Sequence, residues 1–327
     1  MSTGYFGDRE TLYLDNLFWG LITSSHILHK HGIFDAYGHV SVRNPDNPSN
    51  FFIPMNMAPA LLSSADEIIE CKVEDGEPAE KTDKPQFSEK YIHSEIYKKF
   101  PSVNAVVHSH CSDVLPYCIT DVPLKAPIHT TGFLGPEEVP VWDIASVYSS
   151  SDKRHDLLVR NTTHGHALAA AFKPSTSGAF IYSKMRSALP TQLGGSTATE
   201  PVNVPNHPVV LMRGHGFTTC ADGLEAVVYQ AIYTREAAKV TTTALSNSQA
   251  WSQKALVGQI DVQGAGKIKD AKLKDEGKGL HLLSAREVDD TLHFIRDTKM
   301  RPWGLWLREV EVDPMYQNNA KREDSKL

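Results

Sequence analysis

The sequence is poor in three features that mark other classes of protein. Its 327 residues hold only four cysteines, and none forms a CxxC pair, so we expect reduced thiols rather than a disulfide framework or a cysteine-based zinc site. No run of about 18 apolar residues is present, so we expect no transmembrane helix. The formal net charge of −6 supplies no basic surface for nucleic acid. Because the first residues, MSTGYFGDRE, do not resemble a signal peptide, we expect a cytoplasmic protein without membrane or nucleic-acid partners.

What the chain does contain is the composition of a globular protein, 41% hydrophobic and 22% charged, which is enough for a large core. We expect one domain over residues 9–248, and a C-terminal extension over 249–327 that packs on this domain or on a neighbouring subunit. Residues 173–207 are rich in Ser, Thr, Gly and Pro and indicate a loop inserted in the domain. Loops of this length tend to be functional, for example as lids, although a disordered insert is the alternative.

Hydrophobic periodicity predicts several elements of the domain. They are helices over residues 9–31, 152–172 and 222–248, and strands over residues 36–43, 50–54 and 67–73. Gly32 is the expected end of the first helix, and Ser284 to Glu287 has the form of a capping box. Trp303 and Trp306 make the C-terminal segment too apolar for a free tail, so we expect them to cover the domain or a neighbouring subunit.

The stretch from Pro85 to Asp113 contains the first candidate site. Its second half, NAVVHSH ending at His110, is a β-branched apolar run, the composition of a buried strand. Because a strand repeats every two residues, His108 and His110 project from the same face. Two imidazoles on one rigid face at a strand end are a usual way to offer two metal ligands. Two surface histidines at a strand terminus are the plain alternative.

The first half of that stretch has the apolar spacing of a helix, which Pro101 ends. Ser88 is the expected N-cap, and Glu89 then lies in the first turn, with His93 on the same helical face. Exposed backbone N–H groups at a helix start favour a carboxylate. Helix periodicity alone therefore makes Glu89 a residue that complements the helix dipole, not a catalytic one.

A third histidine lies in a second apolar run. Residues 208–220, PVVLMRGHGFTTC, contain His215 between two glycines, which let the backbone turn sharply and leave room beside the imidazole. If this run lies beside the strand of His108 and His110, the three histidines form one site. Zinc or another first-row ion bound by three protein ligands keeps a position open for substrate, which is the mark of a catalytic site.

These pieces together resemble the class II aldolase/adducin family. The resemblance is carried by Ser88-Glu89 with IHSEIY soon after it, by AVVHSH ending at His110, and by LMRGHG around His215, over most of residues 10–245. It implies a three-layer α/β/α sandwich with a central, mainly antiparallel sheet, and commonly a homotetramer. It also implies that His108, His110 and His215 bind a divalent metal and that Glu89 is the acid/base. Zinc is the expected ion, with manganese, cobalt or iron(II) as alternatives.

Two positions depart from the phosphate-using aldolases of that family. Their Gly-Asn turn appears here as Gly38-His39, and their Ser-Ser before the catalytic Glu appears as Phe87-Ser88. Because a phosphate dianion needs several convergent donors, these departures favour an unphosphorylated hydroxy or keto acid. His39 and Ser88 are the substrate-side candidates, with a buried histidine bonded to backbone as the alternative for His39. Arg43 and Arg213 are candidates to bind a substrate carboxylate, or else form structural ion pairs.

Further polar residues are weighed by their place in the chain. His129 lies where relatives have a substrate-side loop, and Tyr316 is the candidate for the C-terminal tyrosine that reaches an adjacent active site in the aldolases. His164 and His166 form a second His-x-His, but residues i and i+2 point apart on a helix. We therefore expect no metal site at that pair.

The expected function is a divalent-metal-dependent carbon–carbon lyase, a decarboxylase or an aldolase, that acts on a small hydroxy or keto acid. The metal would stabilise the enolate left when the bond breaks, and Glu89 would move the proton. The same three histidines equally suit a non-haem iron oxygenase. A third interpretation is an adducin-like scaffold that binds cytoskeletal partners without catalysis, although the retention of Glu89 and all three histidines argues against it.

Overall fold

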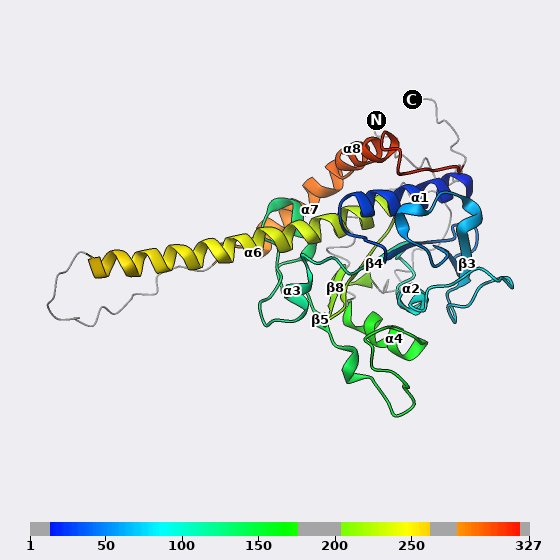
Figure 1. Ribbon diagram of the computed structural model, residues 1–327, viewed down its shortest axis with the longest axis horizontal. Coiled ribbons are helices and arrows are strands. Elements are labelled where there is room, and N and C mark those ends of the chain that lie inside the picture. Colours follow the sequence, from blue (N-terminus) through cyan, green and yellow to red (C-terminus); the bar gives the residue numbers. More distant parts are fainter. Residues whose placement is uncertain (1–13, 176–203, 262–279, 321–327) are drawn as a thin grey trace, which may run out of the picture.

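A seven-stranded sheet lies between two layers of helices (Figure 1). The computed structural model describes residues 14–175, 204–261 and 280–320. The seven strands are β1 (His39–Arg43), β2 (Asn50–Pro54), β3 (Ile68–Lys72), β4 (Ala105–Ser109), β5 (Val141–Trp142), β8 (Val209–Met212) and β9 (Gly216–Ala221). Their order is β3-β2-β1-β4-β9-β8-β5, and every neighbouring pair is antiparallel except β5 with β8. The expected α/β/α sandwich with a mainly antiparallel sheet is confirmed.

Helices cover both faces of this sheet. They are α1 (Leu14–Lys30), α2 (Lys90–Lys99), α3 (Leu115–Cys118), α4 (Thr162–Ala171), α6 (Leu224–Asp261), α7 (Ala285–Thr298) and α8 (Met300–Glu311), with short 3-10 turns η2 (Pro59–Leu61), η3 (Ala65–Glu67), η4 (His129–Leu134) and η5 (Ile144–Ser146). Val40 and Val42 of β1 pack in one core with α1, α6, α7 and α8. Val106 of β4 packs in the other core, with α2 and α4. Because side chains alternate along a strand, His108 lies on the α2 side with Val106.

The N-terminal elements follow the sequence prediction closely. Strands β1, β2 and β3 fall within the three predicted strand ranges. Helix α1 runs into Gly32, whose φ of +63° is a left-handed conformation that glycine adopts without strain. The Gly32 N–H donates to the His29 carbonyl, which closes the helix end. Residues 9–13 of the predicted first helix lie outside the described residues.

The predicted helix over residues 152–172 is wrong in its first half. Helix α4 begins only at Thr162, because the Asn161 side chain accepts the His164 N–H and so caps the helix start. The preceding segment is irregular, and Leu157 has a φ of +66°. His164 and His166 point apart as expected: His164 is buried beside Asp152, whereas the His166 side chain is 70% exposed.

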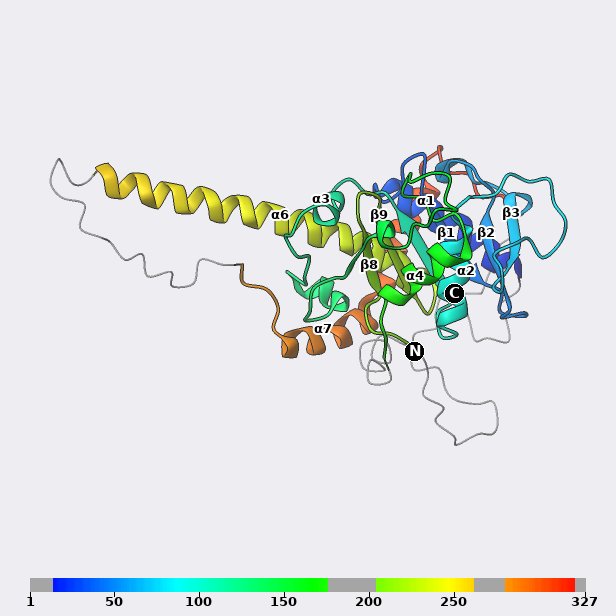
Figure 2. The same ribbon diagram turned by 90° about the horizontal axis from the view of Figure 1, so that it is seen from below.

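Helix α6 continues well past the predicted end at residue 248. Both views show its C-terminal half projecting from the body of the molecule (Figures 1 and 2). No proline or glycine lies between residues 248 and 257, so nothing in the local sequence stops the helix there. Trp251 is 66% exposed on this projecting part. The prediction failed because the polar composition of the segment was taken as a sign of irregular structure.

The C-terminal helices pack on the same body as the sheet. Ser284 and Glu287 form the expected capping box at the start of α7. Trp303 and Trp306 of α8 are buried in the core that contains α1 and α6, and the Trp306 ring lies 5.3 Å from the His31 ring. Both tryptophans therefore cover their own domain, and they supply no apolar surface for a neighbouring subunit.

The ends of the predicted loop insertion lie side by side. Strand β6 (Pro174–Ser175) pairs with β7 (Val204–Pro205) as a small antiparallel ladder. Residues 176–203, the rest of the insertion for which a lid is predicted, lie outside the described residues. In the part of the chain that the structure describes, no helix is long and apolar enough to cross a membrane.

Two buried histidines are expected to make folding depend on pH. Burial lowers the pKa of His26 from 6.5 to about 4, and that of His93 from 6.5 to about 3. Between these values and 6.5 the unfolded chain binds more protons than the folded chain, so the free energy of unfolding falls as the pH drops. Each histidine should contribute a loss of about 2 kcal/mol at pH 5 relative to pH 7.5.

Urea unfolding at both pH values measures this loss. His26→Gln is the matched variant, because a glutamine amide can replace the His26 Nε2 contact to the Leu62 carbonyl (2.6 Å) without titrating. The variant should lose about 2 kcal/mol less than the wild type between the two pH values. An equal loss in the two proteins would mean that His26 is not held neutral by the fold.

Candidate active site

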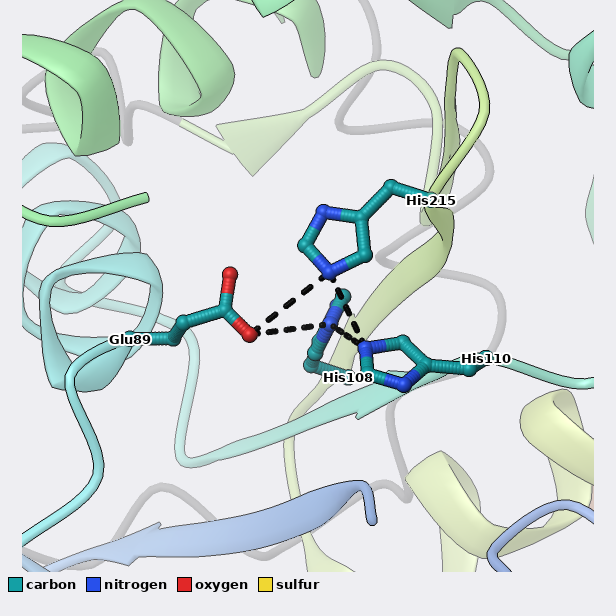
Figure 3. Close-up of side chains that lie close together, drawn as sticks. All are labelled: Glu89, His108, His110 and His215. Atoms are coloured by element: carbon teal, nitrogen blue, oxygen red, sulfur yellow. Dashed lines mark hydrogen bonds and ion pairs between the residues drawn. The ribbon is translucent and has the colours of Figure 1, made fainter. Parts of the chain in front are cut away.

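Glu89, His108, His110 and His215 converge on one point at the α2 side of the sheet (Figure 3). One ligand atom from each side chain lies within 4.8 Å of all the others. His110 Nε2 is 3.0 Å from His108 Nε2 and 3.0 Å from His215 Nε2. Glu89 Oε2 is 3.6 Å from the Nε2 atoms of both His108 and His215. We call these four side chains the metal cluster.

The strand pairing explains how residues 105 positions apart meet. His108 lies on β4 and His110 directly follows this strand, so the two rings share a face as the sequence predicts. The run over residues 208–220 forms two strands rather than one, β8 and β9, and His215 ends the turn between them. Strand β9 pairs with β4, which brings His215 beside the other two rings. A Cβ on Gly216 would lie 2.0 Å from the Ser109 carbonyl oxygen, so only glycine allows the strands to start this close.

Glu89 occupies a different position from the predicted one. It is the N-cap residue of α2, which begins at Lys90, and Ser88 is exposed and does not cap the helix. Glu89 therefore precedes the first turn instead of lying within it. Its Oε1 accepts the Val159 N–H at 3.0 Å, and this contact turns Oε2 toward the histidines. The carboxylate is held by the irregular segment before α4 and not by the helix N-terminus.

A buried contact sets the tautomer of His108. The Thr218 hydroxyl donates to the Met212 sulfur, so its oxygen is free to accept the His108 Nδ1–H at 3.1 Å. With its hydrogen on Nδ1, a neutral His108 presents the Nε2 lone pair to the cluster. Contacts of this kind orient metal-binding histidines and fix their tautomer.

The charge state of the histidines also suits a metal. Burial, with the imidazoles of His215 and His110 next, holds the pKa of His108 well below its ordinary value. Burial and His215 likewise lower the pKa of His110. Both rings are therefore neutral near pH 7, which is the form that binds metals.

The donor set fits a divalent first-row ion. Three imidazole nitrogens and one carboxylate oxygen are ligands that zinc accepts. At zinc–nitrogen bonds of about 2.0–2.1 Å in a tetrahedral site, ligand nitrogens lie about 3.3 Å apart. The observed 3.0 Å separations need an outward shift of only a few tenths of an ångström. Three imidazole nitrogens would leave a position for substrate or for Glu89 Oε2.

His39 lies next to the metal cluster on the same face of the sheet. It is the Cα partner of His108 in the β1–β4 ladder, and the two ring centroids are 5.2 Å apart. Its Nδ1 contacts His93 Nε2 at 2.6 Å, so its buried partner is a side chain and not the backbone. The Phe87 ring lies 4.6 Å from the His39 ring.

The two arginines have other partners. Arg43 is buried, and its guanidinium donates to the carbonyls of Val103, Pro48, Tyr97 and Phe100. These hydrogen bonds give Arg43 a structural role in place of the predicted role of binding a substrate carboxylate. Arg213 is 42% exposed and pairs with Asp143 at 2.6 Å. Arg213 therefore forms a structural ion pair, which was the alternative to binding a substrate carboxylate.

His129 and Tyr316 pack against helices instead of joining the four clustered side chains. His129 is exposed at the start of η4, and its ring lies 5.3 Å from the Phe294 ring of α7. The Tyr316 hydroxyl bonds His29 Nδ1 at 2.8 Å, on α1 of the same chain. Neither residue belongs to the metal cluster found among the described residues.

Sequence reasoning missed the residues that hold the cluster in place. Val159 acts through its backbone N–H, which no side-chain pattern can reveal. Thr218 stands two residues before Cys220 in a strand-like run, where threonine is common for packing reasons. The only available signal was its position three residues after His215, on a strand that was not recognised as separate.

Comparison with known proteins finds a matching family and a similar enzyme. Residues 20–242 match the family described as class II aldolase and adducin N-terminal domain. The chain is 38% identical over 299 residues to the decarboxylase tropJ of Talaromyces stipitatus, an alignment that covers 91% of this chain and 96% of that protein.

Solved structures show the same fold at low identity. An L-fuculose 1-phosphate aldolase from Glaciozyma antarctica PI12 has a TM-score of 0.57 at 15% identity, with 97% of each chain covered. An aldolase II superfamily protein from Pseudomonas syringae has a TM-score of 0.58 at 17% identity, with 94% of this chain and 98% of that one covered. On these grounds the chain belongs to the class II aldolase and adducin family and is an enzyme of the lyase class.

Proposed function

We propose that this enzyme decarboxylates a small, unphosphorylated hydroxy or keto acid that binds a divalent ion at the metal cluster. The observation that carries the proposal is a carboxylate, Glu89, held by the Val159 N–H with its free oxygen 3.6 Å from two of three converging imidazoles. The similarity to a decarboxylase along nearly the whole chain supports this reaction over others of the family.

His108, His110 and His215 would hold the ion, which would act as a Lewis acid toward an oxygen of the substrate. Glu89 Oε2 faces the same point, so a substrate bound there would lie beside it. When the carboxylate leaves as carbon dioxide, its bonding electron pair stays on the neighbouring carbon. Glu89 in its acid form would give this carbon a proton and then regain one from solvent, which balances the reaction.

The surroundings of the metal cluster favour an acid over a sugar phosphate. A phosphate dianion needs several convergent donors. At the two departing positions, His39 is buried beside His93, and Phe87 presents a ring to His39. Ser88 is exposed, and the donors of the Arg43 guanidinium are directed to main-chain carbonyls. Together these residues leave few donors for a phosphate beside the metal cluster.

The test is to incubate the zinc-loaded protein with a panel of hydroxy acids, keto acids and sugar phosphates, while measuring carbon dioxide, aldehyde and oxygen uptake. We expect carbon dioxide from at least one acid, at a rate that chelation abolishes. Release of aldehyde from a phosphorylated sugar, without carbon dioxide, would indicate that the enzyme is an aldolase instead. Oxygen uptake in the iron-loaded protein would favour the oxygenase, and a protein that binds no metal would favour the scaffold.

For the whole chain we propose a homotetramer with a metal-binding domain over residues 9–248 and an extension over 249–327. Support now comes from the family and from the exposed Trp251 on the projecting half of α6, since Trp303 and Trp306 are buried within the chain. Light scattering at micromolar concentration distinguishes this assembly from a monomer.

A further inference from the structure

A chain of buried hydrogen bonds begins beside the metal cluster. His39 Nδ1 contacts His93 Nε2 at 2.6 Å, His93 Nδ1 contacts Ser41 Oγ at 2.6 Å, and Ser41 Oγ contacts the Tyr97 hydroxyl at 2.7 Å. None of these four residues is more than 4% exposed. Such a chain in a protein interior has a direction, because each neutral group must donate to one neighbour and accept from the other.

The direction of these hydrogen bonds follows from counting donors and acceptors, starting at Tyr97. Among the described residues, Ser41 Oγ is the only hydrogen-bond partner of the Tyr97 hydroxyl. Tyr97 therefore donates to Ser41, and the Ser41 hydroxyl donates to His93 Nδ1. The opposite direction would leave the Tyr97 O–H buried without an acceptor, which disfavours it by about five- to a hundred-fold.

The same count then reaches His39. A neutral imidazole has a single N–H, so His93, which accepts on Nδ1, carries its hydrogen on Nε2 and donates to His39 Nδ1. Burial lowers the pKa of His93 to about 3, in agreement with a neutral ring. His39, which accepts on Nδ1, must carry its own hydrogen on Nε2.

In the described part of the chain, the His39 Nε2–H has no hydrogen-bond partner. The atom is also not fully buried, so a ligand can approach it. The His39 ring lies opposite His108 on the same face of the sheet, and Phe87 packs beside it. A single neutral donor suits one carboxylate or carbonyl oxygen, whereas a phosphate dianion needs several donors.

We propose that Ser41, His93 and Tyr97 hold His39 as its Nε2–H tautomer, and that this N–H donates to an oxygen of the acid bound at the metal cluster. The identity of the ligand as an acid rests on the proposed function, but the tautomer of His39 does not. His39 is then a specificity-determining residue, and the other three are positioning residues.

The first experiment measures the tautomer in the full-length, metal-free protein. Magic-angle-spinning NMR of ¹⁵N-histidine-labelled protein separates protonated from unprotonated ring nitrogens, and the signals are assigned by their loss in His39→Asn and His93→Gln. We expect both rings to be protonated on Nε2. Ser41→Ala removes the donor to His93 and should allow both tautomers to appear. A wild-type His39 protonated on Nδ1 would overturn the proposal.

The second experiment measures binding by calorimetry in the zinc-loaded protein, with oxalate as the probe and inorganic phosphate as the control. In His39→Asn, the amide oxygen can still accept the His93 N–H, but no donor reaches the Nε2 position. In His39→Gln, the amide nitrogen reaches that position. We expect His39→Asn to weaken oxalate binding by about ten- to a hundred-fold, the effect of a hydrogen bond to a charged acceptor.

His39→Gln should recover a large part of this loss, and the wild type should bind phosphate more weakly than oxalate because the site offers it too few donors. Unchanged oxalate affinity in His39→Asn would overturn the proposal. Equal losses of oxalate affinity in the two variants, with equal falls in melting temperature, would also overturn it, because they would indicate a structural defect. These outcomes differ from failure of the proposed function. A wild-type protein that releases no carbon dioxide from any acid would refute decarboxylation, while a difference between the two variants would still support the His39 contact.

Discussion

Glu89→Gln is expected to reduce turnover by about 10²–10⁴-fold while the protein still folds and retains its metal. Glutamine has the shape of glutamate, and its amide oxygen can accept the Val159 N–H that Glu89 Oε1 accepts at 3.0 Å. The amide nitrogen then faces the histidines in place of Oε2, and it can neither give nor take a proton at neutral pH. The loss should therefore fall on kcat and not on the binding of substrate.

The matched control is Glu95→Gln on the same helix. Glu95 is also buried, 3% exposed, but its carboxylate faces Lys98 and His166 instead of the metal cluster. Steady-state kinetics, metal content and melting temperature of both variants separate a chemical role from a structural one. If Glu89→Gln stayed within a few-fold of the wild type and of the control, Glu89 would be only a residue that packs at the start of α2.

Removing any one of His108, His110 and His215 is expected to abolish stoichiometric metal binding. The wild-type protein should hold about one divalent ion per chain, because the three Nε2 atoms and Glu89 Oε2 form one site within 4.8 Å. An alanine at one position removes one of three nitrogen ligands. Loss of a residue that merely orients a ligand costs about 10–100-fold in affinity, so loss of a ligand should cost more.

Elemental analysis after dialysis against a weak chelator measures this effect, and two further variants calibrate it. Thr218→Val keeps the shape of the side chain but removes the acceptor of the His108 Nδ1–H, so it should weaken affinity by about 10–100-fold. His166→Ala removes an exposed histidine of α4 and should leave the metal content unchanged. Full metal content in all three cluster variants would refute the assignment of the site.

Most of the metal cluster could be predicted from short-range patterns. His108 and His110 share a face because any strand alternates its side chains every two residues, whatever surrounds it. The flanking glycines marked His215 as the point of a sharp turn, and φ is +65° at Gly214. The capping box at Ser284 was equally local, since both of its partners lie within three residues.

Helix ends were predicted less well, because a few local hydrogen bonds decide them. Glu89 was placed in the first turn of α2, yet it is the N-cap residue. Its carboxylate bonds Val159, 70 residues away, and not its own helix. The start of α4 was placed ten residues early, because Asn161 was not recognised as the N-cap residue.

The roles of the surrounding residues depend on contacts between distant parts of the chain. Arg43 was a candidate for a substrate carboxylate until the fold surrounded it with main-chain carbonyls up to 60 residues away. His39 became a directed donor through His93, 54 residues away. Residue type and periodicity are local properties, and they identified which side chains could bind a metal. Which group each side chain meets, and therefore which hydrogen it carries, is decided only when the strands and helices pack together.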